Sequence, residues 1–334
     1  KLSDAGAAAI AFDIVFSEPD RTSPRQIAAR LPQEEGNEDL LRSLSDLPDN
    51  DDILADSFAL APVVGGFFLL HEDRGDPIEL PTGMAVLGSP PSGQVEHYQG
   101  TVQSLPQLQQ ASAGLGSLSI VGDADGILRR APLVFFHKDK LVPSLSLEAL
   151  RVAQQAGSIL VKTSDGSGET AGAPGSIVSL KVGDFEVPTT AAGELWMHFS
   201  EPAPERTIPA WKLLSDDISE EEIRAAGEGQ IVFVGASATG LRDLISTPLN
   251  ENEPGVIVHA QAAEQMILGE FLTRPDWAPG MEFFLILLLG GGLALLLPGA
   301  GATIGAAIGT VATLAVAAGS WLAFDQLHYL LDPT

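Results

Sequence analysis

Short apolar runs alternate with amphipathic segments up to about residue 274, and the rest of the chain is almost wholly apolar. Apolar runs of this length are typical of buried strands, and apolar positions three and four residues apart are typical of helices. We expect strands at residues 8–16, 62–70, 116–122, 127–136, 176–182, 193–200 and 230–237. We expect helices at 143–157, 218–229 and about 255–272, the last ended by Pro275. The alternation predicts an α/β fold, a mixed sheet flanked by helices.

The stretch from Phe283 to Phe324 contains no charged residue. About 20 apolar residues cross the hydrocarbon core of a bilayer, so this stretch is long enough for two spans. Pro298 lies among glycines and lacks a backbone donor, which predicts that the chain reverses there. We expect transmembrane helices at 277–298 and 299–324 after a folded domain at 1–276. A buried helical hairpin in a large soluble protein is the alternative.

The folded domain is strongly acidic. All 18 Lys and Arg residues precede the first span, as do all but three of the 44 Asp and Glu residues. Such a surface repels phosphate, so we expect no nucleic-acid partner. The chain has no cysteine and therefore neither disulfides nor thiolate chemistry.

Acidic residues interrupt and follow the first expected strand, in "AFDIVFSEPD". Ligands of α/β proteins gather at the carboxyl ends of strands, so this cluster either shapes the domain or contacts a ligand. Its members are Asp13, Glu18, Asp20 and Arg21. We expect Asp13 to accept hydrogen bonds from backbone donors of the adjoining loop, and Arg21 to pair with one of the acids.

A glycine-bounded loop follows the strand at 230–237, in "IVFVGASATGLRD". It lacks the second glycine of a nucleophile elbow and the Gly-Lys pair of a phosphate-binding loop. Its polar side chains could still hold a small anion together with backbone donors. These side chains are Ser237, Thr239, Arg242 and Asp243. A tight turn that only connects elements is the alternative, and a membrane-tethered hydrolase using Ser237 is a rival function.

The remaining polar motifs predict no catalytic site, metal site or cofactor. Asp125 and Gly126 favour a hairpin turn, because a calcium loop would need a glutamate where Pro132 stands. The six histidines have no spacing suited to zinc. Within the second span, Gly301, Gly305 and Gly309 repeat G-x-x-x-G, which favours close helix packing. That packing is either between two chains or against the first span.

The ordered segments resemble the CHASE2 family of extracytoplasmic sensor domains. The matching stretches are "GAAAIAFDIVFSEPDR", "DADGILRRAPLV", "PSLSLEAL", "GQIVFVGASATGLRDLISTPL" and "PGVIVHAQAAEQMILGEFLTRP". The resemblance implies a bacterial receptor with one membrane helix before the sensor, three after it and a cytoplasmic output module. That module is commonly a class III adenylate or guanylate cyclase, a histidine kinase or a Ser/Thr kinase; we expect the cyclase here, with a kinase as the alternative.

Topology follows from this resemblance. With the sensor outside, two spans return the chain outward, so residues 325–334 form an extracytoplasmic connector to a third helix. Because the chain begins at Lys1 and shows no output module, we expect it to be a piece of a longer protein. We expect a multi-pass protein of the inner (plasma) membrane that forms a homodimer. Its expected partners are the lipid bilayer and an unidentified small-molecule or protein ligand. Whether the whole protein is an enzyme depends on the output module.

Overall fold

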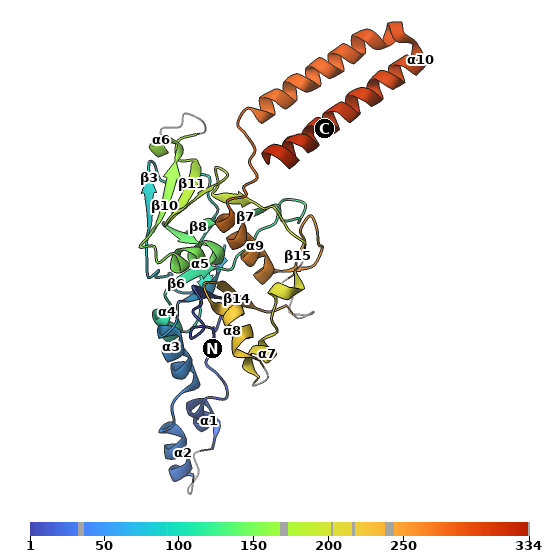
Figure 1. The fold of residues 1–334 in the computed structure, drawn as a ribbon. Coiled ribbons are helices and arrows are strands. Elements are labelled where there is room, and N and C mark those ends of the chain that lie inside the picture. The colour runs from blue at the N-terminus through green and yellow to red at the C-terminus, as the bar shows by residue number, and fades with distance from the viewer. Residues whose placement is uncertain are drawn as a thin grey trace. The chain divides into compact units, whose positions relative to one another are not determined.

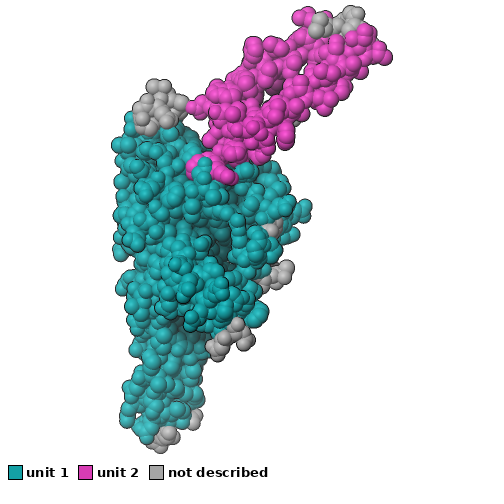
Figure 2. Space-filling view, in the orientation of Figure 1, with its two compact units in different colours: residues 1–269 teal, residues 270–334 magenta. Residues whose placement is uncertain are grey.

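The chain forms two compact units, Lys1–Gly269 and Glu270–Thr334 (Figure 2). The computed structural model describes residues 1–332 except 33–36, 92, 168–172, 202, 216–217 and 238–243, and it leaves the side chains of 167, 296–300 and 302 undescribed. The units divide between Gly269 and Glu270, whereas the sequence placed the boundary after residue 276.

A mixed, mainly parallel sheet forms the centre of the first unit. Its strands β14 (Ile231–Gly235), β1 (Ala9–Asp13), β2 (Val63–Leu70) and β6 (Gly114–Ser117) run parallel in this spatial order. The short strand β5 (Gly100–Val102) pairs antiparallel with the end of β2. The predicted α/β fold with a mixed sheet is therefore confirmed.

The alternation of side chains along β1 explains the layers on the two faces of this sheet. Ala9 and Ala11 point to the face covered by α5 (Leu145–Ala153), where their small size lets Leu145 pack closely. Ile10 points to the opposite face and packs with Phe58 of α3 (Asn50–Ala59) and with α4 (Pro106–Ala111). Helix α9 (Gly255–Leu268) packs against α5 and β14 (Figure 1).

Two smaller sheets extend the first unit. One has the order β12 (Phe185–Pro188), β11 (Ile177–Val182), β10 (Ile159–Thr163), β3 (Met84–Leu87), and the other has the order β4 (His97–Tyr98), β8 (Val134–His137), β9 (Lys140–Pro143). Two strand pairs complete the set: β7 (Arg130–Pro132) with β13 (Glu194–Trp196), and β15 (Leu244–Ile245) with β16 (Glu253–Pro254). The other helices are α1 (Pro24–Arg30), α2 (Glu38–Ser45), α6 (Ser164–Ser167), the 3-10 turn η1 (Pro204–Arg206), α7 (Ala210–Leu214) and α8 (Glu220–Gly227).

All seven predicted strands contain strand residues, but several boundaries differ. The run at 8–16 leaves the sheet after Asp13, and the run at 127–136 divides into β7 and β8.

Helix α5 begins as predicted, with the Ser144 hydroxyl accepting a hydrogen bond from the Leu147 amide, but it ends at Ala153 rather than near Gly157. Helix α9 ends at Leu268, because Gly269 takes the left-handed conformation with φ 71°. The prediction that this helix continues to Leu272 and stops at Pro275 is wrong.

The second unit is a helical hairpin. Helix α10 (Ala278–Leu327) contains two apolar segments long enough to cross a membrane, Ala278–Leu295 and Thr303–Leu327. The chain reverses at Gly301, whose φ of 74° and ψ of 161° are not helical. The predicted break at Pro298 is therefore displaced by three residues, since glycine alone adopts such angles without strain.

This reversal also corrects the predicted glycine stripe. Gly301 forms the turn and does not belong to a helix face. Gly305 is buried within the hairpin, and Gly309 is half-buried with open space around the position of a Cβ. Close helix packing at Gly305 and pairing of two chains through Gly309 both stay predictions.

Candidate functional site

The central sheet has a topological switch point between β1 and β14. Strands β1, β2 and β6 follow one another in chain order, whereas β14 returns to the other side of β1. At such a point the two connections leave in opposite directions, and a crevice forms beyond the carboxyl ends of the strands, where α/β proteins bind ligands. Here those ends are Asp13 and Gly235, which face each other in the strand register.

Helix α9 begins directly against this switch point. A Cβ on Gly235 would lie 2.6 Å from the Cβ of Val256 and 3.2 Å from the Cβ of Asp13, so no larger residue fits without displacing α9. Asp13 is half-buried at the strand end, where the sequence placed it. Its expected role as an acceptor for backbone donors stays a prediction. The contact between Gly235 and Val256 joins the strand end to the first turn of α9.

The other acids of the first cluster hold their own loop in place. The Asp20 carboxylate accepts the Thr22 amide at 2.9 Å and the Asn50 side-chain amide at 2.8 Å. These hydrogen bonds lower the pKa of Asp20 below its ordinary value, and the bond from the Thr22 amide has the largest effect. Arg21 pairs with Glu18 at 3.0 Å, which confirms the expected partnership of the arginine with an acid. Both roles shape the loop, and ligand binding by Glu18, Asp20 and Arg21 stays a prediction.

The predicted anion loop is only partly described. Ser237 is exposed just after β14, whereas Thr239, Arg242 and Asp243 lie outside the described residues. Within the described part of the chain, no hydrogen bond joins the Ser237 hydroxyl to a histidine or a carboxylate. A serine nucleophile needs such a base to remove its proton. The described geometry therefore offers no support for the hydrolase.

A buried histidine lies near the same edge of the sheet. His259, on α9, is 4% exposed and hydrogen-bonds to the backbone of Leu118, which follows β6. Its Nε2 has no hydrogen-bond partner among the described residues. Burial lowers the pKa of His259 to about 4, so the imidazole is neutral at pH 7. A single histidine on a helix has no sequence signature, which is why the analysis of motifs missed it.

The Asp-Gly segment forms a turn as predicted, but not a hairpin, because β6 before it pairs with β2 and β7 after it pairs with β13. Gly126 has a φ of 80°, and its amide donates to the Asp123 carbonyl at 2.7 Å. Asp125 accepts from Arg129 at 2.8 Å, a hydrogen bond that is the main reason its pKa falls to about 2. Arg130 bonds to Asp123 and lies 5.3 Å above the ring of Trp196. The two arginines and the two aspartates are therefore paired with one another, and their contacts hold the turn in place.

Metal binding finds no support in the described ranges, where no three His, Asp or Glu side chains are grouped to hold an ion.

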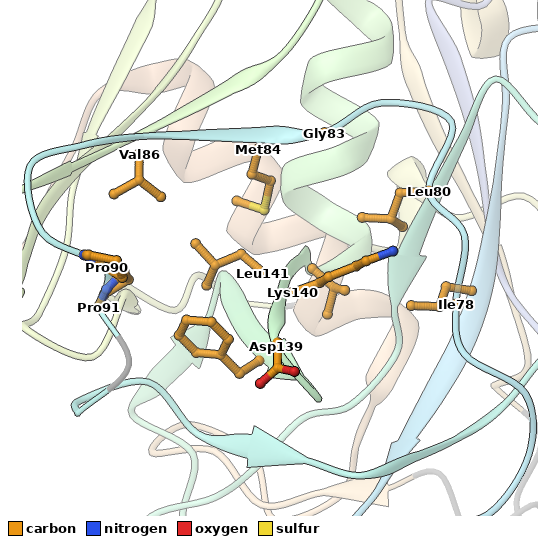
Figure 3. A pocket seen from close by; sticks show the side chains of 12 residues that line it. Ile78, Leu80, Gly83, Met84, Val86, Pro90, Pro91, Asp139, Lys140 and Leu141 are labelled. Atoms are coloured by element: carbon orange, nitrogen blue, oxygen red, sulfur yellow. The ribbon is translucent and has the colours of Figure 1, made fainter.

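A second candidate is an apolar pocket of about 450 Å³ between β3 and the β8–β9 hairpin (Figure 3). Its lining residues are Ile78, Leu80, Gly83, Met84, Val86, Pro90, Pro91, Phe136, Asp139, Lys140, Leu141 and Val142. The volume falls within the range of about 300–1,000 Å³ typical of small-molecule sites. Sequence reasoning did not find the pocket, because its walls come from segments about 50 residues apart that only the folded chain brings together.

Residues 1–296 match the CHASE2 domain family. The chain belongs to this family. CHASE2 domains are extracellular sensor domains of signalling receptors. The match confirms the family inferred from the ordered sequence segments, and it covers the whole first unit and the whole first apolar segment, Ala278–Leu295. No curated protein and no solved structure matches the chain.

Proposed function

We propose that this CHASE2 chain is the sensory and membrane-spanning part of a bacterial receptor whose cytoplasmic output is a class III adenylate or guanylate cyclase. The observation that carries the proposal is the extent of the family match. It runs without interruption from the folded first unit into the apolar helix at Ala278–Leu295. A sensor domain joined in one chain to membrane-crossing helices is the arrangement that a receptor needs.

A route for the signal begins at the switch point. Ligand binding at the carboxyl edge of the sheet would move Val256, because it lies against Gly235 at the end of β14. From there α9 runs to Leu268, and the non-helical segment 269–277 leads to α10. The predicted helix end near Leu272 would have left only a few residues before the membrane, whereas this segment is longer, so any force must pass through its contacts.

Those contacts join the entrance and the exit of the hairpin. The Thr273 amide donates to the His328 carbonyl at 3.0 Å, and the Leu330 amide donates to the Thr273 carbonyl at 2.8 Å. The rings of Trp277 and Tyr329 meet edge to face at 6.1 Å. We name residues 273–277 with 328–330 the hairpin clip. Because the clip ties both ends, the two helices would respond to a shift of the segment as one body.

The clip also supports the expected topology. Both ends of the hairpin lie together, so a hairpin that crosses the bilayer twice returns residues 325–334 to the side from which it entered. With the CHASE2 unit outside the cytoplasm, these residues form an extracytoplasmic connector in a multi-pass protein of the plasma membrane. A third span then has to carry the chain to the output module, which works in a homodimer.

The reading frame beyond Thr334 is the direct test. We expect it to encode a third apolar span and a cyclase domain, and membranes that carry the intact protein should convert ATP or GTP into its cyclic nucleotide. A histidine or Ser/Thr kinase domain there would replace the cyclase but keep the receptor. A frame that ends without an output module would contradict the proposal.

Signal transfer through the hairpin clip has its own test in the intact receptor. Thr273→Pro removes the amide that donates to the His328 carbonyl, whereas Thr273→Val keeps it. We expect the proline variant to change basal or stimulated cyclase output several-fold and the valine variant to leave it unchanged. Equal outputs from wild type and Thr273→Pro would show that the clip does not transmit the signal.

A further inference from the structure

The apolar pocket between β3 and the β8–β9 hairpin has a buried floor and an open wall. Ile78, Phe136 and Val142 form the floor and are 2%, 6% and 0% exposed. Val86 on the wall is 37% exposed, and Met84 beside it is half-buried. Folded proteins seldom leave a concave apolar surface open to water unless something binds there. The described part of the chain leaves this one open.

One unpaired cation lines the pocket. Lys140 is exposed and its ammonium forms no ion pair or hydrogen bond within the described residues, whereas neighbouring Lys138 pairs with Asp73 at 3.2 Å. In Figure 3 the aliphatic stem of Lys140 runs along the pocket and its ammonium points toward Leu80. A lysine placed in this way offers methylene groups to an apolar ligand and a charge to its polar end.

Asp139 limits the charge that the ligand can carry. It also lines the pocket, and Figure 3 shows its carboxylate directed away from the Lys140 ammonium. A group with two negative charges would meet repulsion from this carboxylate, whereas a single negative charge beside Lys140 would be balanced. The net negative charge of the whole chain also disfavours a ligand with two negative charges more than a ligand with one.

We propose that the pocket binds a small molecule with an aliphatic or aromatic body and one singly charged acid group. The body lies against Phe136, Val142 and Met84, and the acid contacts the Lys140 ammonium. The ligand is thus a monocarboxylate or a related monoanion. That such a ligand is the sensed stimulus rests on the proposed function, but its binding does not.

Photo-crosslinking of the full chain in lipid nanodiscs tests the binding. The probe is a trifluoromethyl-diazirinyl benzoic acid, compared with the corresponding benzyl alcohol and benzylamine, and mass spectrometry locates the adducts. We expect saturable adducts of the acid within residues 78–91 and 136–142. The alcohol and the amine should label these peptides several-fold less. Equal labelling by the three probes, or acid adducts only elsewhere, would overturn the proposal.

Two pairs of variants separate charge from shape. Lys140→Gln should weaken binding of the acid by about three- to fivefold and leave the alcohol unaffected, while Lys181→Gln, an exposed lysine outside the lining, should change neither. Val86→Glu should abolish labelling, and Val121→Glu, at a similarly exposed valine outside the lining, should not. Melting temperatures of all four variants report whether the fold is kept. An unchanged affinity of folded Lys140→Gln for the acid would refute the assigned charge contact.

Binding and signalling fail separately in this design. If the acid labels the pocket as expected but leaves the output of the intact receptor unchanged, the pocket assignment stands and its sensory role is wrong. If the reading frame shows no output module, the crosslinking result still decides whether the pocket binds a monoanion.

Discussion

Arg151 and Glu148 form a buried ion pair on α5, with the Arg151 Nη2 2.7 Å from the Glu148 Oε1 and side chains only 7% and 4% exposed. The same guanidinium also donates to the carbonyls of Ala113 and Ala156, each at 2.9 Å. The pair therefore ties α5 to the residue before β6 and to the loop that follows the helix. Burial raises the pKa of Glu148, although the Arg151 hydrogen bond acts against this shift.

Removing one partner of this pair should destabilise the first unit strongly. Glu148→Leu leaves Arg151 buried without its counter-charge, and we expect a loss of about 3–5 kcal/mol in the free energy of unfolding. The double variant Glu148→Leu/Arg151→Met leaves no buried charge and should be more stable than Glu148→Leu alone. Urea unfolding followed by tryptophan fluorescence measures both. A double variant as unstable as Glu148→Leu alone, or less stable, would show that the unpaired Arg151 charge is not the cause of the loss.

Stability should fall as the pH drops from about 6.5 to 4. Burial lowers the pKa of His259 from 6.5 to about 4, so between these values the unfolded chain binds more protons than the folded chain. The contribution of His259 to the free energy of unfolding is fully present above pH 6.5. It decreases by about 3 kcal/mol at most as the pH falls to 4. Burial lowers the pKa of His137 as well, which adds a change of the same sign.

Comparison of variants isolates the His259 contribution. His259→Gln keeps an amide donor for the Leu118 backbone but cannot take up the proton, so its melting temperature should depend less on pH between 4 and 6.5. His71→Gln, at a largely exposed histidine, should keep the wild-type dependence. The interpretation fails if the curves of wild type and His259→Gln are parallel.

Gly116 allows α5 to pack directly on β6. A Cβ at this position would lie 2.5 Å from the Cα of Leu145 and 2.9 Å from the Ser144 carbonyl oxygen. Gly116→Ala should therefore cost about 1–3 kcal/mol, because backbone atoms of the helix would have to move. Gly157→Ala meets no atom within 4 Å and should change stability little. Thermal unfolding of the two variants checks this, and equal melting temperatures would contradict the close approach.

Gly301 sets the reversal of the hairpin. Its φ of 74° with ψ of 161° lies in a region that is almost restricted to glycine, so Gly301→Ala should destabilise the hairpin by about 1–3 kcal/mol. Gly290→Ala, within the first helix and free of steric contact, should be neutral or slightly stabilising. Unfolding of both variants in increasing SDS, followed by the fluorescence of Trp321, gives the comparison. A Gly301→Ala hairpin as stable as wild type would place the reversal elsewhere.

Local patterns predicted the parts of this protein that depend on neighbours in sequence. The apolar run that contains "AIAFD" identified β1, the Asp-Gly pair identified the turn at Gly126, and the uncharged stretch from Phe283 identified the two apolar helices. They succeeded because run length, turn angles and span length are properties of a few adjacent residues. The end of α9 at Gly269 was missed because apolar residues continue the helical pattern beyond it.

The sequence alone determined the family, the α/β class and the presence of a hydrophobic hairpin, because each follows from the order of short segments and from composition. Only the tertiary structure decided which residues distant in sequence are in contact. It set Val256 against Gly235, buried His259 of α9 beside Leu118, moved the hairpin reversal from Pro298 to Gly301 and assembled the pocket around Lys140. Those relationships join residues far apart in the chain, and they arise from packing, which local propensity does not encode.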